Sequence, residues 1–463
     1  MSEELLAPEL ATRALERALA RGGEFAEVFC EERATLTIGL EETRVERVRT
    51  GRERGAGLRV VSGEVTHFAH VDGLAEEDLL AAAEAASSAL ADGRTEPVPV
   101  PAAAAAPGQA IEIPPAEVDD ASKAELLRGL DQHARERGSA VSAVIGSYGE
   151  ERRRVAVANS EGTHATDDRT RVRLGAQAVA RRNGEAETGH ETLGGHRGFE
   201  LVAEQAAGVG ERAADRALTM LDAGPAPAGT MPVVVGGGFG GVLFHEMTGH
   251  GLEADHVQKG ASVYEGRIGE SVAEPLLTAY DDGRLPNEWG TEGIDDEGTP
   301  MQRTAVIEEG QLRSFLYDLL RARKDGVSST GNGRRESFRH LPIPRMTNTY
   351  IAPGDADPEA MISEVKRGFY AVAFAGGQVE PATGDFVFGV SEGYLIEDGR
   401  PTRPCKGATL IGNGLEALRA IDAVGSDFEM KTGFCGKGGQ SVPVGTGQGH
   451  VRIRELTVGG TSL

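Results

Sequence analysis

Apolar residues recur at helical spacing in four stretches of the first half of the chain. The first stretch lies between Pro8, which suits the first turn of a helix, and the helix-breaking pair Gly22-Gly23. Its apolar face consists of Leu10, Ala14, Leu15, Ala18 and Leu19. The same criterion predicts four helices, near residues 8–21, 76–91, 122–137 and 199–221.

Between these helices the apolar pattern changes to the alternation that is typical of strands with one buried face. It is clearest at Leu36, Ile38 and Leu40. Shorter apolar runs extend the prediction to residues 58–61, 141–147, 155–159 and 172–176. After residue 228 the chain is rich in glycine and in strand and turn signals, with few long helical patterns.

These elements predict an α+β protein of several parts, since 463 residues exceed one ordinary core. Residues 1–95 form a small N-terminal α+β domain. Residues 96–120, rich in proline and alanine, form a linker or an extended strap. Residues 121–227 are a middle α+β region, and residues 228–463 are a mostly β domain.

Charge and hydropathy narrow the classes of partner. The net charge of -24 repels phosphate backbones and anionic lipids, which argues against direct nucleic-acid binding. No apolar run reaches the ~18 residues that a membrane span needs. Glu3 and Glu4 stand where a signal peptide has basic residues. We therefore expect a cytoplasmic protein without a membrane segment.

The strongest chemical signal is the stretch 233–251, VVVGGGFGGVLFHEMTGHG, a short strand, a glycine turn and a helix. Histidine is a common zinc ligand, and Glu246 is placed to take a proton from water beside His245. However, five-residue spacing turns His245 and His250 roughly 140° apart on a regular α-helix. A π-type widening or a helix end at Gly249 would bring them together. The spacing alone therefore indicates a distorted metal helix or argues against a metal site.

Two later stretches also carry reactive side chains. Cys435 lies in a glycine turn near Lys437, whose charge favours the thiolate that binds metals. His340 lies in a rigid segment that contains two prolines. The other cysteines, Cys30 and Cys405, are scattered and read as inert buried side chains, so a disulfide framework is not expected.

Four ordered motifs give the chain a resemblance to a known family. They are HEMTGHGLE at residues 245–253, RHLPIPRMTNT at 339–349, GDFVFGVSEGY at 384–394 and CGKGGQ at 435–440. Together with the glycine-rich turn, they resemble the TldD/PmbA family, also described as proposed modulators of DNA gyrase. The resemblance covers almost the whole chain and fits the active, TldD-like member.

The resemblance implies a zinc-dependent peptidase that cleaves short or unfolded peptides. It makes His245, His250 and Cys435 the metal ligands and Glu246 the general base, and it leaves His340 as a contact to substrate or transition state. It also implies a homodimer or a heterodimer with a TldE/PmbA-like paralogue. The acidic net charge indicates basic or neutral peptide substrates.

Several alternatives remain open at this point. The chain could be a non-catalytic chamber subunit, or it could hold zinc for structure alone, although no fourth ligand is evident. Gly236, Gly238 and Gly241 match a dinucleotide fingerprint, but residues 259–266, about 20 positions later, offer no convincing acid at the end of a second strand. Glu253 and Asp255 either orient a ligand histidine or are solvated acids. His256 reads as a surface residue.

Overall fold

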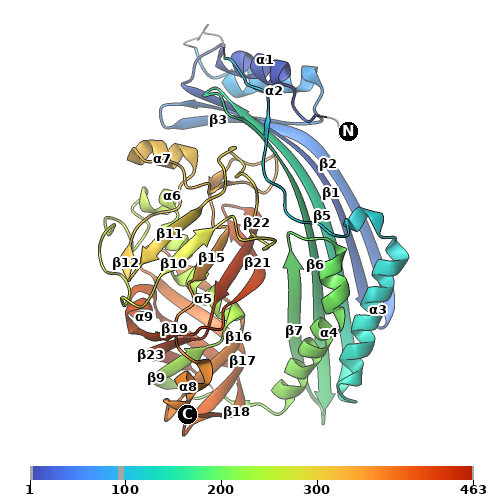
Figure 1. Cartoon of the computed structure of the whole chain (residues 1–463), viewed down its shortest axis with the longest axis vertical. Coiled ribbons are helices and arrows are strands. Elements are labelled where there is room, and N and C mark those ends of the chain that lie inside the picture. Colours follow the sequence, from blue (N-terminus) through green and yellow to red (C-terminus); the bar gives the residue numbers. More distant parts are fainter. Residues whose placement is uncertain (1–3, 92–97, 461–463) are drawn as a thin grey trace.

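The structure, a computed structural model, describes residues 4–91 and 98–460 (Figure 1). Helices make up 23% and strands 45% of it, and its C-terminal part is mostly β, so the predicted α+β class is confirmed. The predicted boundary between residues 95 and 96 lies outside the described residues. Within the described ranges, none of the helices is long and apolar enough to cross a membrane.

One large sheet takes strands from both the N-terminal and the middle regions. Its order is β3-β2-β1-β5-β6-β4, with β7 paired to β6. The strands are β1 Phe25–Glu41, β2 Arg44–Ser62, β3 Val65–Asp72, β4 Ala104–Ala105, β5 Val141–Asn159, β6 His164–Arg182 and β7 Glu185–Gly195. Because β1 pairs antiparallel with β5 over residues 27–41 of β1, the two regions share a continuous sheet.

The two faces of this sheet differ in chemistry because side chains alternate along each strand. Leu36, Ile38 and Leu40 of β1 are buried in one cluster with Leu127 and Val209, which belong to the covering helices. Many, though not all, of the odd-numbered positions of β1 and β6 carry polar or charged side chains, and several of these pair with the C-terminal part. The sheet therefore has an apolar outer face and a charged inner face.

Four helices cover the large sheet. They are α1 Pro8–Leu19, α2 Glu76–Ser87, α3 Asp120–Glu136 and α4 Phe199–Leu221. In Figure 1, α1 and α2 lie across one end of the sheet, and α3 and α4 lie along its outer face. The start of α3 is fixed by Asp119, whose carboxylate accepts a hydrogen bond from the Ser122 amide at 2.9 Å. The predicted bounds of α4 are those observed.

The strand β5 differs from its prediction. We expected two short strands, at residues 141–147 and 155–159, because a polar run separates them. The structure has one strand of 19 residues. The polar run stays extended because its charges find partners on the neighbouring strand: Arg153 Nε donates to Glu31 Oε1 at 2.8 Å, and Arg154 Nη1 donates to Glu32 Oε2 at 2.9 Å.

The segment predicted as a linker follows the edge of this sheet. Its residues Ala104 and Ala105 form β4, which pairs parallel with β6, and the Ala106 amide donates to the Thr166 carbonyl at 2.8 Å. The segment is therefore an extended strap over the part that the structure describes. The predicted division of the chain at residues 95, 120 and 227 stays a prediction.

The C-terminal part contains two further multi-stranded sheets. The six-stranded one has the order β12-β11-β10-β15-β22-β21. Its strands are β12 Gln311–Leu312, β11 Arg303–Glu308, β10 Ala279–Asp282, β15 Asn348–Ile351, β22 Gln440–Gln448 and β21 Glu429–Lys437. As Figure 1 shows, β21 and β22 lie on the side of this part that turns toward the large sheet.

The eight-stranded sheet follows the order β16-β9-β23-β19-β17-β18-β8, and β20 pairs with β23. Its strands are β8 Gly224–Pro225, β9 Gly229–Val235, β16 Arg367–Glu380, β17 Asp385–Glu397, β18 Arg400–Lys406, β19 Ala408–Asn413, β20 Ile421–Val424 and β23 Val451–Gly459. A two-stranded ribbon adds β13 Gly333–Arg334 and β14 Ile343–Pro344. The helices here are short: α5 Gly241–Met247, α6 Ala254–Val257, α7 Leu319–Asp325, α8 Pro358–Ser363 and α9 Gly414–Ala420.

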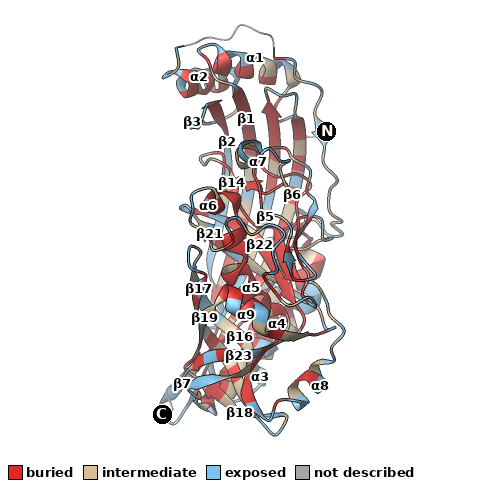
Figure 2. Ribbon diagram, turned by 90° about the vertical axis from the view of Figure 1, so that its left-hand side faces the viewer, coloured by how far each residue is buried: buried red, intermediate tan, exposed pale blue. Residues whose placement is uncertain are grey.

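Buried ion pairs join the charged inner face of the large sheet to the C-terminal part. Arg59 of β2 donates to Glu297 and, at 2.7 Å, to Glu27 of β1. Arg169 of β6 donates to Asp296 at 2.8 Å. All five side chains are buried. Figure 2 shows long red, buried stretches in the strands of the molecule. Desolvated charges of this kind are stable only while their partners stay in place, so this interface fixes the two parts relative to each other.

Candidate metal centre

The glycine run before α5 lets this helix approach the neighbouring strand β22 closely. A Cβ atom added at Gly241 would lie 2.5 Å from the backbone nitrogen of Gly447, a distance that real Cβ atoms do not adopt. The Gly236 amide donates to the Ala371 carbonyl of β16 at 2.8 Å. The glycines therefore hold the start of α5 in the angle between two sheets.

The helix that carries the histidines ends between them. Helix α5 stops at Met247, and Thr248 has φ -127° and ψ -52°, which is outside the helical range. A separate 3₁₀ turn, Gly249–Leu252, follows and carries His250. Of the two distortions expected from the sequence, the structure has the helix end and not the π-type widening.

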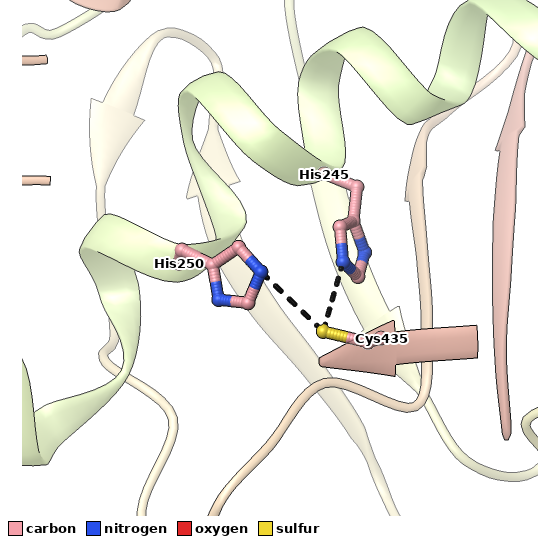
Figure 3. A group of neighbouring side chains, drawn as sticks. All are labelled: His245, His250 and Cys435. Atoms are coloured by element: carbon pink, nitrogen blue, oxygen red, sulfur yellow. Dashed lines mark hydrogen bonds between the residues drawn. The ribbon is translucent and has the colours of Figure 1, made fainter. Parts of the chain in front are cut away.

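Because the helix ends there, both histidines reach one cysteine of β21 (Figure 3). Nε2 of His245 and Nε2 of His250 each lie 3.3 Å from Sγ of Cys435. The three ligand atoms all lie within 4.8 Å of one another, and the three residues are buried. Cys435 stands 190 positions after His245, so this convergence is a product of the tertiary fold.

The two nitrogen–sulfur distances in this cluster fit a zinc ion. Zinc bonds of about 2.05 Å to nitrogen and about 2.3 Å to sulfur, at the tetrahedral angle, place the two ligand atoms roughly 3.5 Å apart. The observed nitrogen–sulfur distances of 3.3 Å are close to this value. Two imidazoles and a thiolate are also a donor set that zinc prefers.

A buried carboxylate orients one of the two rings. Oε2 of Glu253 lies 2.9 Å from Nδ1 of His250, and Nζ of Lys437 lies 3.1 Å from the same oxygen. With Nδ1 donating to Glu253, the lone pair of Nε2 points at the cluster, as in the carboxylate–histidine pairs of metal sites. Nδ1 of His245 has no such partner among the described residues.

The electrostatics of the cluster favour the ligand form of the thiol. Burial raises the pKa of Cys435, but the neighbouring His245 and His250 outweigh it and lower this pKa to about 5. Burial alone would lower the pKa of His250, but Glu253 and Cys435 outweigh burial and raise this pKa well above its ordinary value. For Glu253, burial raises the pKa, and Lys437 and His250 lower it to about 2. A metal ion would replace the proton that the histidines share with the thiolate.

Comparison with known families covers most of the chain. Residues 26–90 match the model of the PmbA/TldA metallopeptidase domain 1. Residues 113–221 match the central domain of the same family, and residues 228–460 match its C-terminal domain. The chain belongs to the PmbA/TldD family. Both histidines and Cys435 lie within residues 228–460, the range that matches the C-terminal domain.

Individual members of the PmbA/TldD family agree with this assignment. A protein of Haemophilus influenzae called "Metalloprotease TldD homolog" is 44% identical over 422 residues, which are 89% of this chain and 87% of that protein. A "Zinc metalloprotease TldD homolog" of Saccharolobus solfataricus is 33% identical over 246 residues, 53% of this chain and 55% of that protein. The crystal structure of TldE from Thermococcus kodakarensis has the same fold, with a TM-score of 0.78 and 20% identity over 97% of this chain and 99% of that chain.

The other residues singled out in this PmbA/TldD chain lie apart from the cluster or contact it indirectly. His340 Nδ1 lies 3.0 Å from Ser337 Oγ, and no described hydrogen bond or ion pair joins it to the cluster. Its role in substrate binding stays a prediction. Cys30 and Cys405 are buried and free, as expected. Asp255 forms an ion pair with Lys437 at 2.6 Å. His256, which was expected at the surface, is half-buried.

Near this PmbA/TldD site, one residue has a different role from the one expected, and another was missed in the sequence. Lys437 was expected to act on Cys435 directly, but its ammonium group binds Glu253 and so acts through His250. Arg345 is fully buried, and its guanidinium group donates to the carbonyl of Cys435 and, at 3.4 Å, to that of Gln440. Arg345 thereby anchors the hairpin that carries the thiol. The sequence signal that could have pointed to Arg345 is its position directly after a rigid segment with two prolines.

This PmbA/TldD chain does not have the fold that a dinucleotide-binding turn requires. A dinucleotide-binding turn joins two parallel strands of one sheet through a helix. Here β9 precedes the glycine turn, but the next strand along the chain, β10, belongs to a different sheet. The glycines are explained instead by the close packing of α5 described above.

Proposed function

We propose that the chain is a zinc-dependent peptidase that hydrolyses short or unfolded peptides. The observation that carries this proposal is the convergence of His245, His250 and Cys435, with Glu246 beside them. The names of the PmbA/TldD relatives support a metalloprotease, and one of them specifies zinc. The distances in the cluster support the same metal.

In this reading the protein supplies three ligands and one proton carrier. A zinc ion at the cluster would supply Lewis acidity, which makes a water molecule acidic near neutral pH and polarises the peptide carbonyl. Glu246 is partly exposed, and its Oε2 lies 3.8 Å from Nε2 of His250. Its carboxylate would accept a proton from the attacking water and return it to the leaving amine.

The number of protein ligands favours catalysis over a purely structural zinc site. Structural sites are closed by four protein ligands, and catalytic sites keep one position open. Among the described residues the cluster offers His245, His250 and Cys435 and no fourth ligand atom at the same spacing. Because a thiolate donates more charge than an imidazole, we infer a moderate Lewis acid suited to selective processing.

Metal removal tests the proposal directly. We expect a chelator of zinc such as phenanthroline to abolish cleavage of an unstructured peptide, because the three ligands alone cannot polarise its carbonyl. Added zinc should restore cleavage, and magnesium, which prefers oxygen ligands, should not. Cleavage that persists in protein shown by metal analysis to be free of zinc would contradict the proposal.

The buried carboxylate behind His250 should matter for metal affinity. We expect Glu253→Gln to weaken zinc binding about 10- to 100-fold, because it removes the charge that orients the ring and raises its basicity. Competition with a coloured chelator measures this affinity. Asp255→Asn is the matched control, since Asp255 binds Lys437 and not the ring. Equal losses in the two variants would contradict an orienting role for Glu253.

We further propose that the active particle is an oligomer. The structural similarity to TldE supports pairing with a TldE/PmbA-like paralogue, and a homodimer is the alternative. In either assembly the cluster would face an enclosed space that admits extended chains and excludes folded proteins. The mass of the purified particle, with and without a co-expressed paralogue, distinguishes the two.

A further inference from the structure

A second polar site lies behind the hairpin that carries Cys435. A cavity of about 260 Å³ is bounded by the charged inner face of the large sheet and by β21 and β22. Phe434 lines this cavity, whereas the next residue, Cys435, faces the histidines. Because successive side chains of a strand point to opposite faces, the hairpin separates the cavity from the metal cluster by its own thickness.

The walls of this cavity carry more arginine than acidic side chains. Its arginines are Arg33, Arg153, Arg171, Arg173 and Arg335. Its acidic residues are Glu150, Glu151 and Glu336. Four of the five arginines are paired with carboxylates, which are those of Glu151, Glu31, Glu292 and Glu27 respectively.

Arg173 is the exception. Across the described ranges, no carboxylate lies within 4.0 Å of its guanidinium group, and its Nε is buried without a hydrogen-bond partner. Burial without a counter-charge lowers the pKa of Arg173. Nη1 of the neighbouring Arg171, on the same face of β6, also lacks a hydrogen-bond partner. Arg171 is nevertheless paired with Glu292, so Arg173 is the unpaired cation. An unpaired cation in a partly buried position is costly, so the donors of Arg173 are free for an anion from solution.

An aromatic wall stands beside this free charge. The guanidinium carbon of Arg173 lies 5.4 Å from the ring centre of Phe434, which is 54% exposed. Trp289 packs edge-on against Phe434, with ring centres 5.6 Å apart. Its indole nitrogen donates to the Gly433 carbonyl at 2.9 Å, and its own carbonyl accepts from Arg171 at 3.0 Å. These bonds fix Trp289 beside Phe434, whose other contact is the guanidinium group of Arg173.

We propose that this cavity binds a carboxylate group of the peptide substrate, with Arg173 as the charged contact and Phe434 as the apolar one. The carboxylate is either the C-terminal group of the peptide or an acidic side chain. This inference rests on the proposed peptidase function, and it reverses the preference for basic or neutral peptides expected from the net charge. The charge that lines the cavity determines which peptides bind there, because salt screens the repulsion between the whole acidic chain and an acidic peptide over about 10 Å.

Trp289 provides a direct test because it is the chain's single tryptophan. The experiment titrates the full chain carrying Glu246→Gln with acetylated peptides of one glycine, serine and leucine sequence, and follows tryptophan fluorescence. One peptide ends in a free carboxylate, a second in an amide, and a third in an amide but with one internal glutamate. We expect at least one carboxylate peptide to bind about tenfold more tightly than the plain amide. If the peptide with the free C-terminus binds more tightly, the site takes the C-terminal carboxylate; if the peptide with the internal glutamate binds more tightly, the site takes an acidic side chain.

A pair of arginine variants on β6 gives the matched comparison. Arg173→Met should abolish the tenfold preference without lowering the melting temperature, because it removes a partly buried charge that has no partner. Arg173→Lys should retain part of the preference. Arg182→Met removes the same charge from an exposed pair with Asp222 at the far end of the strand and should bind like the parent.

The outcomes separate this inference from the peptidase proposal because binding is measured without cleavage. Equal affinities for the carboxylate and amide peptides overturn the carboxylate site, whether or not the parent protein cleaves peptides. Equal losses in Arg173→Met and Arg182→Met also overturn it. A flat titration together with a changed particle mass in Arg173→Met would instead make the exposed Phe434 surface a subunit interface. A tenfold preference that depends on Arg173 supports the site even if peptide cleavage is never observed.

Discussion

Glu246→Gln is expected to reduce peptide cleavage to less than about one hundredth of the parent rate while the protein keeps its zinc. The amide has nearly the shape of the carboxylate but cannot accept a proton, and general base catalysis contributes about 100- to 10,000-fold. Glu246 does not belong to the group of three ligand residues, so metal binding should survive. Cleavage of an unstructured peptide and metal content are measured on the same preparation.

The matched control for this variant is Glu359→Gln. Glu359 lies on the short helix α8 of the same C-terminal part, is exposed and has no place in the cluster. It should leave cleavage unchanged. If Glu246→Gln kept more than about a tenth of the parent activity, Glu246 would not be the base. If it lost zinc as well, the loss of cleavage would report on metal binding and the assignment of Glu246 as a proton carrier would fail.

His245→Ala and Cys435→Ala are each expected to lower the zinc content from about one ion per chain to less than about a tenth. Each variant removes one of three ligand atoms, and a site with two protein ligands no longer holds the ion in a defined geometry. His245 lies on helix α5 and Cys435 on strand β21, so the pair of variants tests the tertiary arrangement and not only the helix. Metal analysis after dialysis measures the effect.

Cys405→Ala is the control for the cysteine variant. Cys405 is equally buried, and burial raises its pKa, so it remains a thiol. Its removal should leave zinc binding unchanged. Circular dichroism spectra of all variants should match the parent. Zinc at the parent level in Cys435→Ala would remove the thiolate from the site and leave the two histidines as a structural pair.

Much of the local structure followed from the sequence because it depends on neighbours in the chain. The bounds of α4 were predicted correctly, since a 23-residue amphipathic stretch between glycine and proline signals leaves little freedom. The strand β5 was divided in error because apolar periodicity alone does not account for arginines that are buried by pairing. Its partners, Glu31 and Glu32, lie 122 positions away.

The candidate site was predictable in a different way. The spacing of His245 and His250 was ambiguous by itself, because it required a helix end whose position depends on packing against other elements. Cys435 was included through the resemblance of motifs, since no periodicity relates it to the histidines. Glu253 and Asp255 could not be told apart in the sequence; only the fold shows that one binds His250 and the other Lys437.

The buried ion pairs between the large sheet and the C-terminal part limit how this protein can change during evolution. Loss of Arg59 alone would leave Glu297 as an uncompensated negative charge, whereas Glu27 would keep Arg335, and an unpaired buried charge costs about 3–5 kcal/mol. Natural selection should therefore remove single replacements at these buried ion pairs. A lineage could alter this contact only through simultaneous, charge-compensating exchanges on both partners, so these positions should drift together or not at all.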